Sequence, residues 1–298
     1  MQQNRFVGFL LLSLATAFTA TAGVLLRWLE EPAEWRTIFY RALFFAATLI
    51  AWVGITRRGR IVRAVRSVGA TGLLCALFYT ISTTTFIFAL FHTTVARTVF
   101  INGLTPLLTG IIAWIVLRER VAAATWFGIG IAMIGILIMT GEELSAGAIH
   151  GDTLALICSL SAATMYTLIR RGRAVDMLPA FIVAAFITAI VAAPWIDDFA
   201  ASWHDMGIYA VLGCVQLGIQ YVLLTMGARH LPAAEAALTT RLTLVLGPLF
   251  AWLGAGEIPG TMTLIGGTVI VAAILMHGLW TLRGERRRVK VPAEAMGE

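Results

Sequence analysis

Charge is scarce in this sequence: Asp, Glu, Lys and Arg together make up 13% of its 298 residues, whereas soluble proteins carry about 25%. Apolar residues reach 59%, against about 45–50% in an ordinary soluble protein. This composition excludes a soluble globular domain and indicates a protein of the lipid bilayer. Because one membrane-spanning helix takes about 20 residues, the chain has room for about a dozen spans and little else.

Cysteine is also rare, and the residues that usually support chemistry form no known motif. Cys75, Cys158 and Cys214 each lie within an apolar run, which excludes a disulfide framework and a CxxC metal motif. The histidines form no HExxH pattern, and there is no P-loop for ATP. We therefore expect no catalytic residue, no metal site and no cofactor.

Ten apolar stretches joined by short loops emerge from a window of about 19 residues. They cover residues 6–28, 35–55, 68–91, 94–117, 121–140, 152–170, 177–196, 205–227, 232–253 and 259–282. The sequence therefore predicts an all-α integral membrane protein with ten transmembrane helices.

The few charges indicate orientation. Arginines follow spans two, four, six and eight and recur in the C-terminal tail, whereas the opposite loops carry Glu and Asp. Positive residues collect on the cytoplasmic side of short loops, so we expect both termini to be cytoplasmic. On this interpretation the net charge of +6 reports topology rather than a nucleic-acid surface.

The two halves of the chain contain related segments. Residues 113–119 (AWIVLRE) match residues 251–257 (AWLGAGE) at an offset of 138, and Gly128 stands in the same relation to Gly266. These matches predict a five-helix repeat over residues 1–140, a second over 141–282, and a basic tail, 283–298. Since five is odd, the copies would be inverted in the membrane, an architecture that places a substrate site between them.

A resemblance to a known family is carried by the ten short-looped spans, the segment from Ala233 to Ala237, Pro106 and Pro248, and the helix-end acids Glu119 and Glu257. In these features the sequence resembles the EamA-type branch of the drug/metabolite transporter superfamily. Within it, the sequence is most similar to bacterial inner-membrane exporters of aromatic and other amino acids. The resemblance implies ten helices around a central cavity and export of a small metabolite by alternating access. It also implies a multi-pass protein of the bacterial inner membrane, with the bilayer and a small-molecule substrate as partners and no obligate protein partner.

Other functions stay open at this point. A protein of the same fold could instead export drugs or nucleoside-type metabolites. An intramembrane enzyme needs paired acids, a Ser/Lys or Ser/His pair, or a metal cluster at depth, and the sequence offers no matched set. A structural or receptor subunit is disfavoured by the repeat.

Three arginines lie at membrane depth, where an ionisable group is a functional hypothesis by default. Arg241 stands nine residues past the start of span nine, about 14 Å along a helix. It either anchors a substrate carboxylate through two parallel hydrogen bonds or bonds helix carbonyls or a glutamine. Arg41 and Arg97 lie just inside the outer ends of spans two and four. They either snorkel outward or form an outer gate, with Glu31 and Glu34 as partners of Arg41.

Polar and aromatic side chains within the spans complete the predicted substrate site. Gln216 and Gln220 are spaced i and i+4 and so share one helical face, which lines a cavity or contacts a neighbouring helix. Pro106 removes a hydrogen bond and frees the carbonyl of Asn102, which predicts a kink in span four. The further substrate-binding candidates are Tyr79, Thr83, Phe100, Asn102, Thr164 and Tyr166.

Overall fold

A computed structural model of the chain describes residues 2–56, 65–66, 69–118, 123–140, 146–171, 178–227, 230, 239–240 and 242–289, which hold helices and no strand. The α-helices are α1 (Gln2–Ala20), α2 (Ala22–Arg27), α3 (Glu34–Thr56), α5 (Gly69–His92), α6 (Val95–Asn102), α7 (Thr105–Leu117), α8 (Ala123–Thr140), α9 (Ala146–Arg171), α10 (Leu178–Ala192), α11 (Trp203–Ala210), α12 (Gln220–Gly227), α14 (Thr243–Ala255) and α15 (Thr261–Val289). A short 3₁₀ helix, η1 (Ala193–Trp195), follows α10, and a π-helix, η2 (Val211–Ile219), connects α11 to α12.

Within the described residues, seven helical segments are long and apolar enough to cross a membrane. They cover Phe6–Arg27, Glu34–Thr56, Gly69–His92, Val95–Val116, Ile149–Ile169, Leu178–Trp195 and Trp203–Gly227. These segments match seven of the predicted spans. The other three predicted spans correspond to shorter apolar helices at Trp126–Ile138, Thr243–Ala255 and Thr261–Ala273, so the number of ten transmembrane helices stays a prediction.

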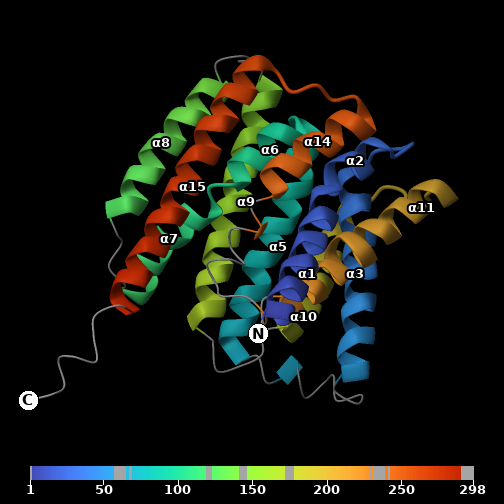
Figure 1. Cartoon of the computed structure of the whole chain (residues 1–298). Helices are drawn as coiled ribbons and strands as arrows, with labels where there is room; N and C mark the ends of the chain where they lie inside the picture. The colour runs from blue at the N-terminus through green and yellow to red at the C-terminus, as the bar shows by residue number, and fades with distance from the viewer. Residues whose placement is uncertain are drawn as a thin grey trace, which may run out of the picture.

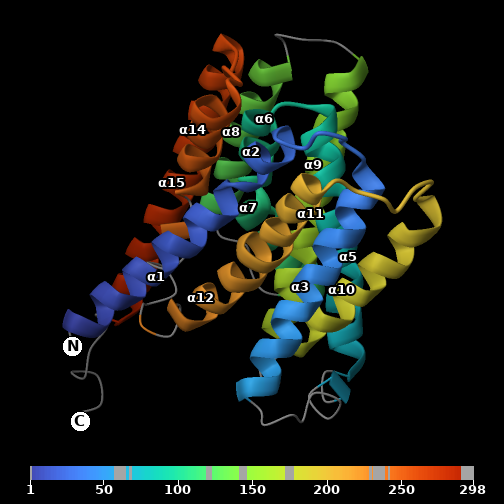
Figure 2. The ribbon, with the colours of Figure 1, turned by 90° about the vertical axis from the view of Figure 1, so that its right-hand side faces the viewer.

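The helices form a bundle in which neighbours in space are often distant in sequence (Figure 1). Helix α5 packs along α9, α3 lies between α10 and η2, α1 packs on α12, and α8 pairs with α15 (Figure 2). Helix α1 begins and α15 ends at the same end of the bundle (Figure 1). We call the opposite end, where α2 ends and α3 and α9 begin, the acidic end, because it carries Glu30, Glu31 and Asp152.

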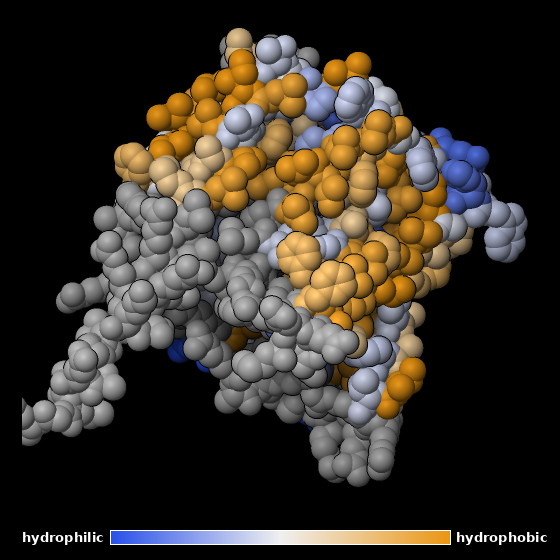
Figure 3. Space-filling view, viewed as in Figure 1, coloured by the Kyte–Doolittle hydropathy of each residue, from blue (hydrophilic) through white to orange (hydrophobic). Residues whose placement is uncertain are grey.

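Apolar side chains cover broad areas of the described surface (Figure 3). Ile190 is 70% exposed, Leu253 71% and Leu137 68%. Monomeric soluble proteins rarely expose apolar patches of this extent. The exposed apolar side chains are therefore expected to face lipid, whereas the buried ones, such as Phe45 and Ile87, hold the bundle together.

Two of the spans change their helical geometry near the middle. The predicted kink in span four is confirmed: α6 ends at Asn102, α7 begins at Thr105, and Pro106 stands in its first turn, where a missing N–H costs least. In the other segment, the π-helix η2 occupies the centre of the continuous helix from Trp203 to Gly227. Such π segments are rare and occur frequently at functional sites.

Candidate functional site

A cavity of about 570 Å³ opens between helices from both halves of the sequence. Its walls come from α1, α2, α5, α6, α7, α9, α12 and α14. Of the predicted substrate residues, Asn102, Tyr166 and Gln220 line it. Apolar side chains such as Phe86 and Leu224 alternate there with hydroxyls such as Thr16, Thr19, Thr105 and Thr109. This mixed lining suits a ligand that has both a polar and an apolar part. We call it the central cavity.

The break between α6 and α7 places polar backbone and side-chain atoms at the wall of the central cavity. The helix break frees the carbonyl of Asn102 from its helical hydrogen bond. The hydroxyl of Thr105 donates to this carbonyl over 2.7 Å, so one of its two lone pairs is already used. The hydroxyl of Ser159, on α9, donates to Oδ1 of Asn102 over 2.9 Å. This bond orients the Asn102 amide at the wall of the central cavity.

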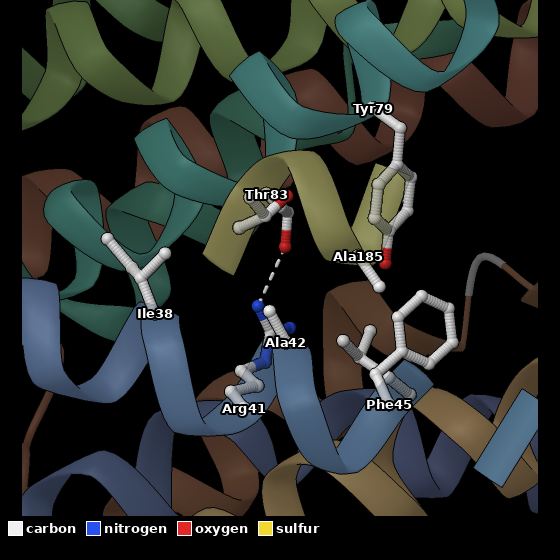
Figure 4. A pocket seen from close by; sticks show the side chains of 9 residues that line it. Ile38, Arg41, Ala42, Phe45, Tyr79, Thr83 and Ala185 are labelled. Carbon is white, nitrogen blue, oxygen red and sulfur yellow. Dashed lines mark hydrogen bonds between the residues drawn. The ribbon is translucent and has the colours of Figure 1, made fainter. Parts of the chain in front are cut away.

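A second, much smaller cavity of about 10 Å³ lies beside Arg41 (Figure 4). Arg41 is only 4% exposed. Its Nε and Nη2 donate to Oε1 of Gln216 over 3.3 and 3.0 Å, and its Nη1 donates to Oγ1 of Thr83 over 2.8 Å. Tyr79 lines the same cavity. The structure thus brings three predicted substrate residues, Tyr79, Thr83 and Gln216, together around the buried predicted gate residue Arg41.

Of the alternatives for Arg41, the pairing with Glu31 is not formed in this structure. The carboxylate of Glu31 lies 3.2 Å from Nη2 of Arg36 instead, and Arg36 also donates to the carbonyl of Ala200 over 2.6 Å. Arg36 lies close to the start of α3, whereas Arg41 lies more than one turn deeper and points into the bundle. Depth along the helix therefore decides which arginine reaches the loop carboxylate.

Two glycines let η2 approach α3 closely enough for Gln216 to reach Arg41. A Cβ added to Gly213 would lie 2.7 Å from the carbonyl oxygen of Arg41 and 2.9 Å from the backbone nitrogen of Phe45. A Cβ on Gly218 would lie 2.5 Å from the side chain of Thr48. Only a residue without a side chain permits this close contact between two helices.

Arg97, the second predicted gate residue, forms an ion pair that the sequence analysis missed. Its Nε donates to Oδ1 of Asp152 over 3.1 Å, and its Nη2 contacts Oδ2. The two side chains are 3% and 12% exposed. The hydroxyl of Thr93 donates to the same carboxylate over 3.4 Å. The signal was present, because Asp152 is an acid at the very start of an apolar span, but it was not assigned a partner.

Glu257 makes a further contact between distant segments at the acidic end. Its Oε1 accepts from the backbone N–H of Val95 over 2.6 Å, and its Oε2 accepts from Nε of Arg27 over 3.1 Å. The acid therefore satisfies one of the free N–H groups at the start of α6 and joins it to the end of α14. The repeat comparison singled out Glu257 as a helix-end acid but did not predict this role.

The remaining predicted site residues lie elsewhere. Phe100 is buried, and its ring lies where a Cβ on Gly267 would stand. The hydroxyl of Thr164 donates to the carbonyl of Leu160 over 2.9 Å, within its own helix. Neither residue belongs to the described lining of the two cavities. Arg241 lies outside the described residues. Among the described residues, no group of three metal-ligating side chains comes together.

Comparison with known proteins shows which family the chain resembles and which relatives share its sequence. The model of the EamA-like transporter family matches the chain twice, over residues 6–141 and 149–279. The chain is 24% identical over 250 residues to the pseudopaline exporter CntI of Pseudomonas aeruginosa, covering 80% of this chain and 84% of that protein. It is 24% identical over 179 residues to the uncharacterized transporter YdfC of Bacillus subtilis, covering 57% of this chain and 58% of that one.

The fold has a solved counterpart as well. One crystal structure superimposes with a TM-score of 0.60 at 20% identity and covers 95% of this chain and 98% of its own. At that identity the likeness concerns the fold alone. The two family matches together span most of the sequence, and the chain belongs to the EamA-like transporter family.

Proposed function

We propose that this transporter exports small amphipathic metabolites, foremost amino acids with aromatic or apolar side chains, from the bacterial cytoplasm by alternating access, without enzymatic activity or a cofactor. The observation that carries the proposal is the central cavity. Its volume of about 570 Å³ lies within the range of about 300–1,000 Å³ that is usual for small-molecule sites. Asn102, Gln220 and the hydroxyls would bind the polar part of the substrate, and Tyr166 and Phe86 the apolar part. A relative named as an exporter favours the outward direction.

Two observations support two inverted five-helix repeats, divided near residue 140. The family model matches each half separately. The helix contacts also come in related pairs: α5 packs on α9 as α12 packs on α1, and α3 contacts η2 as α10 contacts α5. A shift of about 138 residues along the chain relates α5 to α12 and α1 to α9 in the first case. In the second case it relates α3 to α10 and α5 to η2. In such architectures the repeats rock against each other around a site at their interface.

We also propose that the acidic end is the outer gate, with the termini on the cytoplasmic side. Arg97 and Asp152 join the first half of the chain to the second, and so do Arg27 and Glu257. Opening this end would require these ion pairs to separate. A carboxylate on the substrate is proposed to bind Arg241, as its depth in span nine predicts.

The proposal is tested by counterflow of labelled amino acids in liposomes that contain only the purified protein. We expect Gln220→Leu to insert and fold but to transport much more slowly, because a cavity amide is lost. Thr268→Val is the matched control, since Thr268 is exposed and donates only to the carbonyl of Leu264, 2.7 Å away, in its own helix. Counterflow of no amino acid by the wild type would refute this substrate class, and counterflow of drugs or nucleosides would support the alternative exporter.

A further inference from the structure

Arg41 is a buried cation whose bonded partners are all neutral. A guanidinium carries five N–H donors, and Arg41 makes three hydrogen bonds, two of them to the single oxygen Oε1 of Gln216 and one to Thr83. None of the carboxylates in the described residues is among its partners. Burying a charge without a counter-charge in a membrane protein is costly, and such residues are retained where they bind something.

A second, independent feature of the same cavity is the hydroxyl of Tyr79. It is buried, it lines the cavity beside Arg41 (Figure 4), and it has no hydrogen-bond partner in the structure. Buried polar atoms without a partner are uncommon, and each calls for an explanation. The hydroxyl of Thr83 accepts from Arg41 and therefore keeps its own hydrogen free to donate. The polar residues of the cavity's described lining are Arg41, Tyr79, Thr83 and Thr188, each of which carries a donor hydrogen, and no carboxylate is among them.

The geometry around Gln216 shows what such an acceptor would replace. Nε and Nη2 of Arg41 converge on its amide oxygen, and this edge of a guanidinium is one that binds carboxylates through two parallel bonds. The amide supplies one oxygen without charge where an anion would supply a full negative charge. At about 10 Å³ the cavity holds about one water-sized particle, so only a compact anionic group fits without displacing Gln216.

We infer that Arg41, Tyr79 and Thr83 form a binding site for one compact monovalent anion, either a small inorganic anion such as chloride or, at Arg41 in place of Arg241, the carboxylate of the transported metabolite. The second source rests on the proposed export function, and the first does not. A carboxylate would displace the Gln216 oxygen from Arg41. Gln216 lies in the π-helix η2, four residues before Gln220 in the central cavity, so binding at Arg41 would be transmitted to the cavity wall.

The test measures thermal unfolding of the purified protein in micelles, in a chloride-free buffer brought to constant ionic strength with sulfate. Sodium chloride is titrated in one arm, and a candidate amino acid and its carboxylate-free amine in two others. We expect a saturable rise in Tm with chloride, with the amino acid, or with both, and the responding arm identifies the source. No rise in any arm would overturn the inference.

Variants assign the response to this site. Tyr79→Phe is expected to weaken anion affinity by about 10- to 150-fold, the usual effect of losing a hydrogen bond to a charged group. It should not lower Tm without anion, because the hydroxyl has no partner to lose. Arg41→Gln should abolish the response. The control Arg36→Gln removes a buried arginine of the same helix whose acceptors lie outside the cavity, and it should keep the response.

An unchanged anion affinity in Tyr79→Phe would overturn the site even if Arg41→Gln does not fold. The outcome is separable from that of the proposed function. A normal anion response in a protein that transports no amino acid would refute amino-acid export and leave the site standing, whereas amino-acid transport without any anion response would do the reverse.

Discussion

The ion pair between Arg97 and Asp152 provides the sharpest stability test, because both side chains are almost fully buried and form a two-pronged contact. Removing one member of a buried pair leaves the other charge uncompensated, which costs about 3–5 kcal/mol. In Asp152→Asn one carboxamide oxygen can still accept a hydrogen bond from Arg97. We therefore expect a loss at the lower end of that range, about 3 kcal/mol in the free energy of unfolding.

Replacing both members separates charge from volume. The double variant Arg97→Met with Asp152→Leu fills similar space without any charge, and swaps of this kind are often neutral or even stabilising. We expect the double variant to have a larger free energy of unfolding than Asp152→Asn alone. Asp197→Asn is the control, because Asp197 is exposed, and its effect should stay within about 0.5 kcal/mol.

The assay is equilibrium unfolding in mixed micelles, followed by tryptophan fluorescence and circular dichroism. A cost of Asp152→Asn no larger than that of Asp197→Asn would show that the ion pair contributes nothing to the native state. A double variant as unstable as the single one would show that packing, and not an uncompensated charge, is what was lost. Either result would refute the reasoning.

Further outcomes follow from the same structure. Gly213→Ala should lower the free energy of unfolding by about 1–3 kcal/mol, the usual cost of overpacking. Gly207→Ala, where a Cβ would meet nothing, should change it by no more than about 1 kcal/mol; equal effects in thermal unfolding would refute the close contact with α3. With single cysteines at Gly59 and Ser145 in a cysteine-free protein, a membrane-impermeant reagent outside intact cells should label only the latter, and the reverse pattern would invert the topology. Arg241→Met should weaken transport of an amino acid about 10- to 150-fold and that of its carboxylate-free amine much less; equal losses would make Arg241 structural.

The sequence by itself determined the positions of seven long apolar helices and the break in span four, because these depend on neighbouring residues. Seven predicted spans coincide with long apolar helices of the structure, since hydropathy within about 20 residues is enough to place a segment in the bilayer. The break before Pro106 is equally local, because proline lacks the N–H that would continue the preceding turn, although Pro248 stands inside the unbroken helix α14. The family resemblance, which also follows from the sequence alone, agrees with the family match.

Only the tertiary structure decided which side chains meet. Arg41 and Gln216 are 175 positions apart, Arg97 and Asp152 are 55 apart, and Glu257 and Val95 are 162 apart. Each pairing depends on which helices become neighbours, on the depth of each residue along its own helix, and on the room that glycines such as Gly213 leave between helices. Hydropathy reports none of these quantities, since it measures how well a segment dissolves in lipid and is the same on every side of a helix. For that reason the sequence left Arg41 open between an outer gate and a side chain that snorkels outward, whereas in the fold it is buried and bonded to Gln216 and Thr83.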